Sequence, residues 1–286
     1  MDLLTIYTNT GKVEFGIDKV KYIITSDFSQ VFKIIQTLNK VFSKALDSEY
    51  DEENMQMRVL INNKNVDKNN LLFNVNHLFD LETDLKLGAK SLTLNYLTTV
   101  LRDIECHELV STINTLMHSV NDYLGELISD KHLKVMLNEL NLKLIQKNLS
   151  ARLVRDELEY HSYNLSYDEL ILYQLDKLNI IAQKNGLLTY WVVLNIPEMT
   201  AQIEKVIMGL EKNIRVIVHT NNSIVRDLKD ALVINKRVLD LSDETEIYNV
   251  VMMNYSKHLT IEELKQKLIE YVNLKDRSTH EIDGLI

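Results

Sequence analysis

The side chains that could support chemistry are concentrated in two stretches of the second half of the chain. Residues 164–170 read Asn-Leu-Ser-Tyr-Asp-Glu-Leu and have the composition of a helix start. An apolar run at 191–194 is followed at 195–200 by Asn-Ile-Pro-Glu-Met-Thr. A polar helix start and a polar strand end, placed in this order, could together hold a nucleotide and its metal ion, so nucleotide hydrolysis is the first chemistry to test.

The order of these stretches resembles that of the ABC and chromosome-maintenance ATPase heads, in which a Leu-Ser-Gly-Gly signature opens a helix and a strand ends in Asp-Glu-Pro-Thr. Asn195 stands where the strand-end Asp would hold magnesium, and a neutral amide is a weaker partner for a hard cation. Tyr167 and Asp168 stand where two glycines would let the backbone approach a phosphate. The sequence therefore predicts a degenerate head.

The phosphate loop, with its pattern G-x-x-x-x-G-K-[ST], should follow an early strand. After the strand predicted at 20–24, residues 25–30 read Thr-Ser-Asp-Phe-Ser-Gln and contain no glycine. Asp27 would compete with a phosphate for the helix N-terminus. Cys106 and His107 are adjacent, which by itself gives no nucleophile–base geometry, and no His/Cys cluster has zinc spacing. We therefore expect no catalytic residues and no bound nucleotide.

The elements that must position these stretches alternate between strand and helix at both ends of the chain. The chain opens with a hairpin that turns at residues 9–11, followed by a strand and a helix. Two further strands follow. A helical middle then extends from about 89 to 146, and it divides into two long helices near Gly125 and residues 129–130. Helices and strands then alternate. The predicted strands are 2–7, 12–17, 20–24, 59–61, 71–75, 188–194, 215–219 and 237–241, and the predicted helices after the middle are 167–185, 199–210, 227–232 and 261–272.

Alternation of this kind implies parallel strand pairing through right-handed crossovers. Pro197 is the only proline of the 286 residues, and no Pro- or Ser-rich linker divides the chain, so a second domain must be an insertion. We predict an α/β fold with a degenerate phosphate-loop ATPase-like sheet. Residues 1–88 and 156–286 would form the head domain, and residues 89–155 an inserted helical domain.

The composition limits where the chain can act. A single cysteine, Cys106, rules out an internal disulfide and fits a reducing cytoplasm. The apolar runs are short, far below the ~20 residues that a membrane-spanning helix needs, so we expect a cytoplasmic protein without membrane partners. The net charge of −9 taken alone argues against nucleic acid, but local charge matters more than the total.

Several stretches carry a second and closer resemblance. Residues 165–171 read Leu-Ser-Tyr-Asp-Glu-Leu-Ile, 180–185 read Ile-Ile-Ala-Gln-Lys-Asn, 194–200 read Leu-Asn-Ile-Pro-Glu-Met-Thr, and 84–92 read Asp-Leu-Lys-Leu-Gly-Ala-Lys-Ser-Leu. These stretches resemble the Csn-two family of type II-A CRISPR adaptation proteins, and the longer form of the family is the better match. The resemblance spans almost the whole chain element by element, with specific matches in 84–92 and 164–220.

This resemblance implies a homotetrameric ring with a basic central hole that encircles double-stranded DNA and favours free ends. It implies a role in the acquisition of new spacers in antiviral defence, alongside the CRISPR integrase proteins and the RNA-guided nuclease. It also implies calcium ions, which help to shape the ring in shorter members of the family.

One segment has the charge that DNA binding requires. Residues 131–155 carry six basic residues against one acid, Glu139, for a net charge of +5. Lys86 and Lys90, which flank Gly88, are weaker candidates. The alternative interpretation of the basic segment is a solvated helix face. Contacts of this kind go to phosphates, so we expect sequence-independent, salt-sensitive binding. The six basic candidates are Lys131, Lys134, Lys143, Lys147, Arg152 and Arg155.

The candidate calcium ligands are Glu157, Glu159 and Asp168, because calcium takes several carboxylate oxygens. Residues 161–164, His-Ser-Tyr-Asn, depart from the acid-rich run of shorter family members. Glu169 is expected to cap the helix that starts after Ser166. The alternative role of these acids is helix-end electrostatics.

Two other functions stay open at this point. The first is a degenerate head that acts as a protein–protein scaffold without DNA, and salt-sensitive DNA retention would distinguish it from a clamp. The second is a nucleotide-binding enzyme with an unrecognised loop, which nucleotide-dependent thermal stabilisation would reveal.

Overall fold

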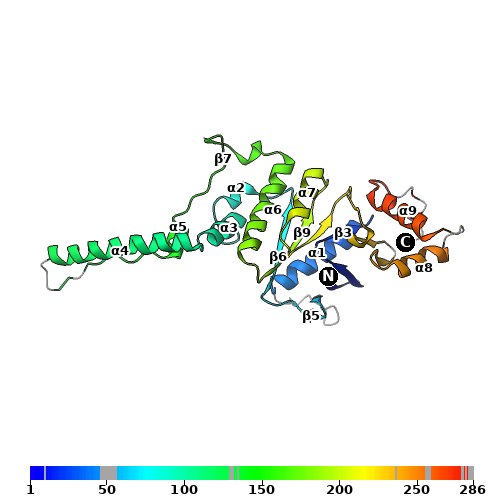
Figure 1. Cartoon of the computed structure of the whole chain (residues 1–286), viewed down its shortest axis with the longest axis horizontal. Coiled ribbons are helices and arrows are strands. Elements are labelled where there is room, and N and C mark those ends of the chain that lie inside the picture. Colours follow the sequence, from blue (N-terminus) through cyan, green and yellow to red (C-terminus); the bar gives the residue numbers. More distant parts are fainter. Residues whose placement is uncertain are drawn as a thin grey trace. The chain divides into compact units, whose positions relative to one another are not determined.

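The computed structural model divides the chain into two compact units (Figure 1). The first unit comprises Met1–Phe79 and Ser166–Ile286, and the second comprises Asp80–Leu165. The structure describes residues 1–9, 11–45, 57–128, 132–133, 135–235, 237–254, 259–277, 280 and 282. The boundaries lie at 80 and 165, whereas the sequence placed them at 89 and 155.

A six-stranded sheet forms the centre of the first unit, with the order β12-β11-β3-β10-β9-β6. Neighbouring strands are parallel except for the antiparallel pair of β11 and β12. The strands are β3 (Val20–Ile24), β6 (Asn70–Asn76), β9 (Thr189–Asn195), β10 (Ile214–His219), β11 (Ala231–Ile234) and β12 (Val238–Asp240).

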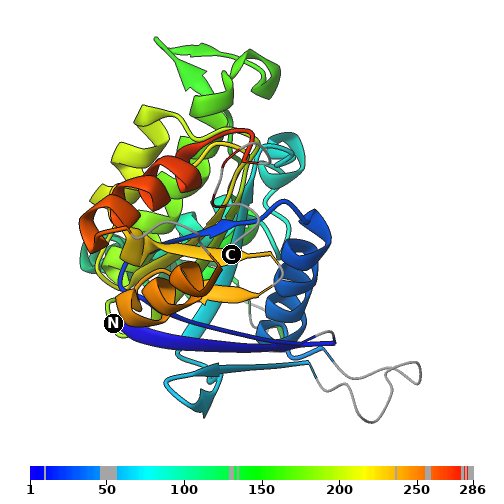
Figure 2. The same cartoon turned by 90° about the vertical axis from the view of Figure 1, so that its right-hand side faces the viewer.

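The central strands are buried on both faces, because helices cover each side of the sheet (Figure 2). In this view α1 lies on one side, and α6 and α7 lie on the other. The helices are α1 (Phe28–Phe42), α6 (Tyr167–Lys184) and α7 (Ala201–Gly209). Continuous apolar runs such as 191–194 are typical of strands in this position.

A second sheet packs against α1 and has the order β2-β1-β4-β5. Its strands are β1 (Asp2–Thr8), β2 (Gly11–Ile17), β4 (Arg58–Ile61) and β5 (Lys64–Asn65). The core between the two sheets includes Phe15, Leu38 and Trp191. At its edge the ammonium group of Lys21, fully buried on β3, lies 2.5 Å from a carboxylate oxygen of Asp240.

The carboxyl-terminal part of the first unit contains two helices, α8 (Glu244–Asn254) and α9 (Ile261–Asn273). The sequence predicted α9 but missed α8. It also predicted a helix at 227–232, which is wrong. That stretch forms a 3-10 turn, η2 (Leu228–Asp230), and then enters β11, because its apolar residues are needed in the buried sheet.

The second unit is mainly helical. Its elements are α2 (Leu81–Asp84), α3 (Leu92–Val100), α4 (Ile104–Leu127), α5 (Leu142–Lys147), β7 (Val154–Arg155), β8 (Leu158–Glu159) and η1 (Ser162–Asn164). Within the parts of the chain that the structure describes, no helix is long and apolar enough to cross a membrane.

The second long helix predicted after residues 129–130 is wrong, because residues 135–141 form no helix and only the short helix α5 follows them. Two asparagines of α4 hold this segment through its backbone. The side chain of Asn114 bonds both the N–H and the carbonyl of Leu140, and that of Asn121 bonds those of Leu137. These amide contacts replace the hydrogen bonds that a helix would make.

Candidate nucleic-acid interface

The short helix α5 presents two of the predicted basic residues. Lys143 and Lys147 are four positions apart on it and both are exposed. Asn141 is the N-cap of the helix, and its side chain accepts from the Leu144 N–H at 3.0 Å. Gln146 donates to the Thr98 hydroxyl at 3.1 Å, which fixes α5 to α3. The two lysines therefore project from an anchored helix, and neither forms an ion pair with any carboxylate that the structure describes.

The two arginines lie on the hairpin of β7 and β8 or next to it. Arg152 forms an exposed ion pair with Glu159 at 3.2 Å, so part of its charge is neutralised. Arg155 lies over the ring of Tyr160, 5.0 Å from its centroid. Glu139, the one acid of the basic segment, lies 3.1 Å from the exposed imidazole of His118. Lys131 and Lys134 lie outside the described residues.

The loop that carries Lys86 and Lys90 is held in place by a buried carboxylate. Asp84 accepts hydrogen bonds from the N–H groups of Leu92 and Thr93 at 2.6 and 3.1 Å and from the Thr93 hydroxyl at 2.5 Å. Both lysines are exposed. Because Asp84 joins the two ends of the loop, it presents these lysines in a defined conformation.

Two of the three predicted calcium ligands have partners in this structure, and the third lies in a turn. Glu157 is exposed and has a positive φ of 66°, as does Asp156 at 51°, so the pair forms the tight turn between β7 and β8. Glu159 pairs with Arg152, and Asp168 accepts from the Thr200 hydroxyl at 3.1 Å. Among the residues described, no three His, Cys, Asp or Glu side chains are grouped so that they could hold a metal. Glu157 and Glu159 lie in the second unit and Asp168 lies in the first, and calcium binding by these acids stays a prediction.

In the first unit, the residues at the ATPase motif positions make structural hydrogen bonds. Asp27 is the N-cap of α1 and accepts from the Ser29 N–H at 2.9 Å. Asn195, at the end of β9, lies 2.9 Å from Nδ1 of His219. Burial, and secondarily Arg277, lower the pKa of His219, so the ring is neutral at neutral pH.

The helix start that takes the place of the signature motif is similarly occupied. The Tyr167 hydroxyl donates to the carbonyl of Glu198 at 2.5 Å. Ser166 and Glu169 form the predicted capping box of α6, which is confirmed. Thr260 and Glu263 form a second capping box, at the start of α9. At the start of α6, the Ser166 side chain thus bonds a backbone N–H group that a phosphate would otherwise approach.

No family model matches the chain, and no curated protein is similar enough in sequence to match it. A solved structure does match. Stu0660 of Streptococcus thermophilus superposes with a TM-score of 0.70 at 14% identity, over 95% of this chain and 86% of Stu0660. Stu0660 is the Csn-two protein of a type II-A CRISPR system.

The chain has the Csn-two fold. The resemblance predicted from the sequence is thereby confirmed at the level of the fold. The recombination mediator protein RecF with ATP superposes with a TM-score of only 0.36 at 14% identity, over 83% of this chain and 98% of RecF. This similarity is too low to indicate a shared fold.

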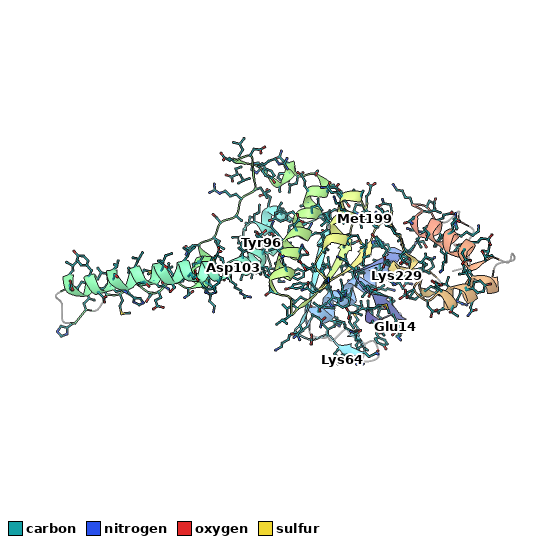
Figure 3. All side chains as sticks on the ribbon, viewed as in Figure 1. Glu14, Lys64, Tyr96, Asp103, Met199 and Lys229 are labelled. Atoms are coloured by element: carbon teal, nitrogen blue, oxygen red, sulfur yellow. The ribbon has the colours of Figure 1, made fainter. Side chains whose placement is uncertain are left out.

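Helix α4 carries an exposed apolar surface that was not predicted from the sequence. Asp103 is the N-cap of α4, and side chains project along both sides of the helix in Figure 3. No residue of α4 is buried. Large apolar residues recur on it with spacings of four and three, the heptad pattern of packed helices, and are 43–64% exposed. The members of this α4 seam are Leu109, Ile113, Leu116, Val120, Tyr123 and Leu127.

Proposed function

We propose that the chain is a non-catalytic DNA clamp of the Csn-two family that acts in CRISPR spacer acquisition in the cytoplasm. The observation that carries the proposal is the similarity of almost the whole chain to Stu0660. The partners would be double-stranded DNA, the CRISPR integrase proteins and the RNA-guided nuclease.

The α4 seam supports self-association, which the homotetramer implied by the resemblance requires. A heptad pattern packs best against a second helix of the same period, and another copy of α4 supplies one. The charged residues flanking the seam, Glu105 and Glu126, lie near its two ends, so the middle of the seam can pack without burying charge. An exposed apolar surface of this length is typical of an interface, and we assign a second copy of this chain to it.

The basic segment supports DNA binding. Lys143 and Lys147 are exposed on an anchored helix, and four copies would focus positive potential on a shared axis. Arg155 and the loop with Lys86 and Lys90 would add phosphate contacts. Side chains of this type fix position on the backbone without reading sequence.

The first unit supports a degenerate ATPase-like head rather than an enzyme. Asp27, Asn195 and Tyr167 each make a structural hydrogen bond at a position where an ATPase would contact nucleotide or magnesium. If calcium binds, as the resemblance implies, Glu159 and Asp168 would exchange their present contacts with Arg152 and Thr200 for the metal ion.

The test compares linear and closed-circular duplex DNA of equal length, with and without calcium, at increasing salt. The full-length protein is compared with the double variant K143Q/K147Q and with the control K205Q/K212Q, which removes the same charge from two exposed lysines of the first unit. We expect retention of linear DNA only, weakened in K143Q/K147Q and unchanged in the control.

Equal losses in the two double variants would mean that overall charge, and not α5, governs binding. If a folded oligomer retained neither form of DNA, the clamp would be refuted. The alternative, a degenerate head that acts as a protein scaffold without DNA, would then be favoured.

A further inference from the structure

A polar cleft of about 450 Å³ lies at the carboxyl ends of β3 and β10. These neighbouring strands are the centre of the parallel sheet, and the chain leaves β3 toward one edge of the sheet and β10 toward the other. Crevices at such a switch point are where open α/β sheets bind ligands. Ser26 follows β3, Thr220 follows β10, and both line the cleft.

The charge of the cleft favours an anion. Lys275 and Arg277, from the segment after α9, line it together with Asp276, so two cations face one acid. Lys275 is exposed and makes no ion pair with a carboxylate in the described part of the chain. It also lines an adjoining cavity of about 230 Å³ with Tyr167 and Glu198. Of the two cations, Lys275 is therefore the better placed to bind an anionic ligand.

The polar groups suit a phosphate monoester. Asn195 Oδ1 accepts from Nδ1 of His219, which leaves Nε2 of the neutral ring as an acceptor. A phosphate monoester with a second pKa near 6 is partly protonated at neutral pH and can donate to that nitrogen. Its other oxygens can accept from the lysine ammonium and from the Ser26 and Thr220 hydroxyls.

An aromatic ring beside the cleft suits a base. The ring of Phe28 is 5.4 Å from the ring of His219, centroid to centroid, and Phe28 is 56% exposed. Exposed aromatic rings next to cations are the usual platform for stacking a nucleobase. Asp27 caps the N-terminus of α1 and would repel a phosphate there. The phosphate would therefore bind on the side of the cleft formed by the segment after α9.

We propose that this cleft binds a nucleoside 5′-monophosphate group without a metal ion. The group could come from a free nucleotide or from the 5′-phosphorylated end of a DNA strand. The site differs from a hydrolytic nucleotide site because it takes a single phosphate and offers no strand-end carboxylate for magnesium. Binding of the free nucleotide does not depend on DNA encirclement.

The experiment is calorimetric titration of the full-length protein with AMP, adenosine and inorganic phosphate. We expect AMP to bind at least about tenfold more tightly than adenosine, since a charge-assisted hydrogen bond is lost with the phosphate. K275A should weaken AMP binding by about tenfold or more. F28A should weaken AMP binding but leave inorganic phosphate unchanged. The matched control K205A, an exposed lysine on α7, should bind AMP as the unmodified protein does.

A second arm compares duplexes with 5′-phosphate and 5′-hydroxyl ends. If the phosphorylated duplex binds more tightly and AMP competes with it, the ligand of the cleft is the 5′-phosphorylated end of DNA. If the two duplexes bind equally, the ligand is the free nucleotide. The proposal is overturned if AMP does not bind, or if K275A and K205A lose affinity equally. Because the AMP titration contains no DNA, failure of the clamp would leave this result interpretable.

Discussion

Substitution of Leu116 by alanine should weaken self-association without weakening the fold. Leu116 is 64% exposed in one chain. Full burial of a leucine side chain contributes about 1.5–3 kcal/mol, so burial of the exposed part contributes about 1–2 kcal/mol. When α4 packs against its copy, the residue is buried once in each chain. The variant should therefore lose about 2–4 kcal/mol of association free energy, which raises Kd roughly 30- to 700-fold.

The assay is sedimentation equilibrium over a range of protein concentrations, paired with urea unfolding at a concentration where the protein is monomeric. L187A is the matched control, because Leu187 is 97% exposed in the first unit and outside the α4 seam. An exposed leucine should change monomer stability by no more than about 0.5 kcal/mol. Unchanged association of L116A, or an equal loss in L187A, would refute the assignment of a second copy to the seam.

Three further predictions concern DNA, pH and capping. If Lys143 and Lys147 of four copies contact about eight phosphates, the slope of log K against log salt is about −7, and K143Q/K147Q should flatten it in filter-binding assays; an unchanged slope would exclude these contacts. Burial lowers the folded-state pKa of His219 below the ordinary histidine value of about 6.5, so its contribution to stability is present above pH 6.5 and is lost as pH falls below it. H219Q should therefore reduce the pH dependence of the urea unfolding midpoint below pH 6.5. If the midpoint of H219Q depended on pH as steeply as that of the unmodified protein, the claim that His219 is buried as a neutral ring would be contradicted. S166A should lower the free energy of unfolding in urea by about 1 kcal/mol, because the side-chain cap of α6 is lost. An unchanged free energy of unfolding would mean that Glu169 alone is enough to cap the helix.

The sequence predicted the elements whose pattern is local. The hairpin of β1 and β2, the strand β9 and the helix α6 follow from alternation, from a continuous apolar run and from a capping box, and all three are present. The parallel order also follows from the alternation of strands and helices. Such elements are predictable because their hydrogen bonds and caps involve residues close in sequence.

The errors fall where distant partners decide the structure. Residues 227–232 have helical spacing, but Ala231 and Leu232 complete a buried strand that pairs with β3, about 200 residues earlier in the chain. Residues 135–141 form no helix, because Asn114 and Asn121 hold backbone groups of this segment. Neither partner is visible from a local window. The heptad of α4 was visible in the sequence, but its exposure was not, because helical periodicity alone does not distinguish a core face from an interface.

The loss of ATPase chemistry in this fold extends beyond any one residue. Restoring the strand-end acid with N195D would place a carboxylate next to His219, and would still leave Asp27 capping α1 and the Tyr167 hydroxyl bonded to the Glu198 carbonyl. Each of these side chains now makes a hydrogen bond within the head, so reverting one leaves the others in place. We therefore expect N195D to hydrolyse no ATP in the presence of magnesium. Hydrolysis by N195D would show that Asn195 alone blocks catalysis, and would contradict the view that the head is stabilised by its replacements.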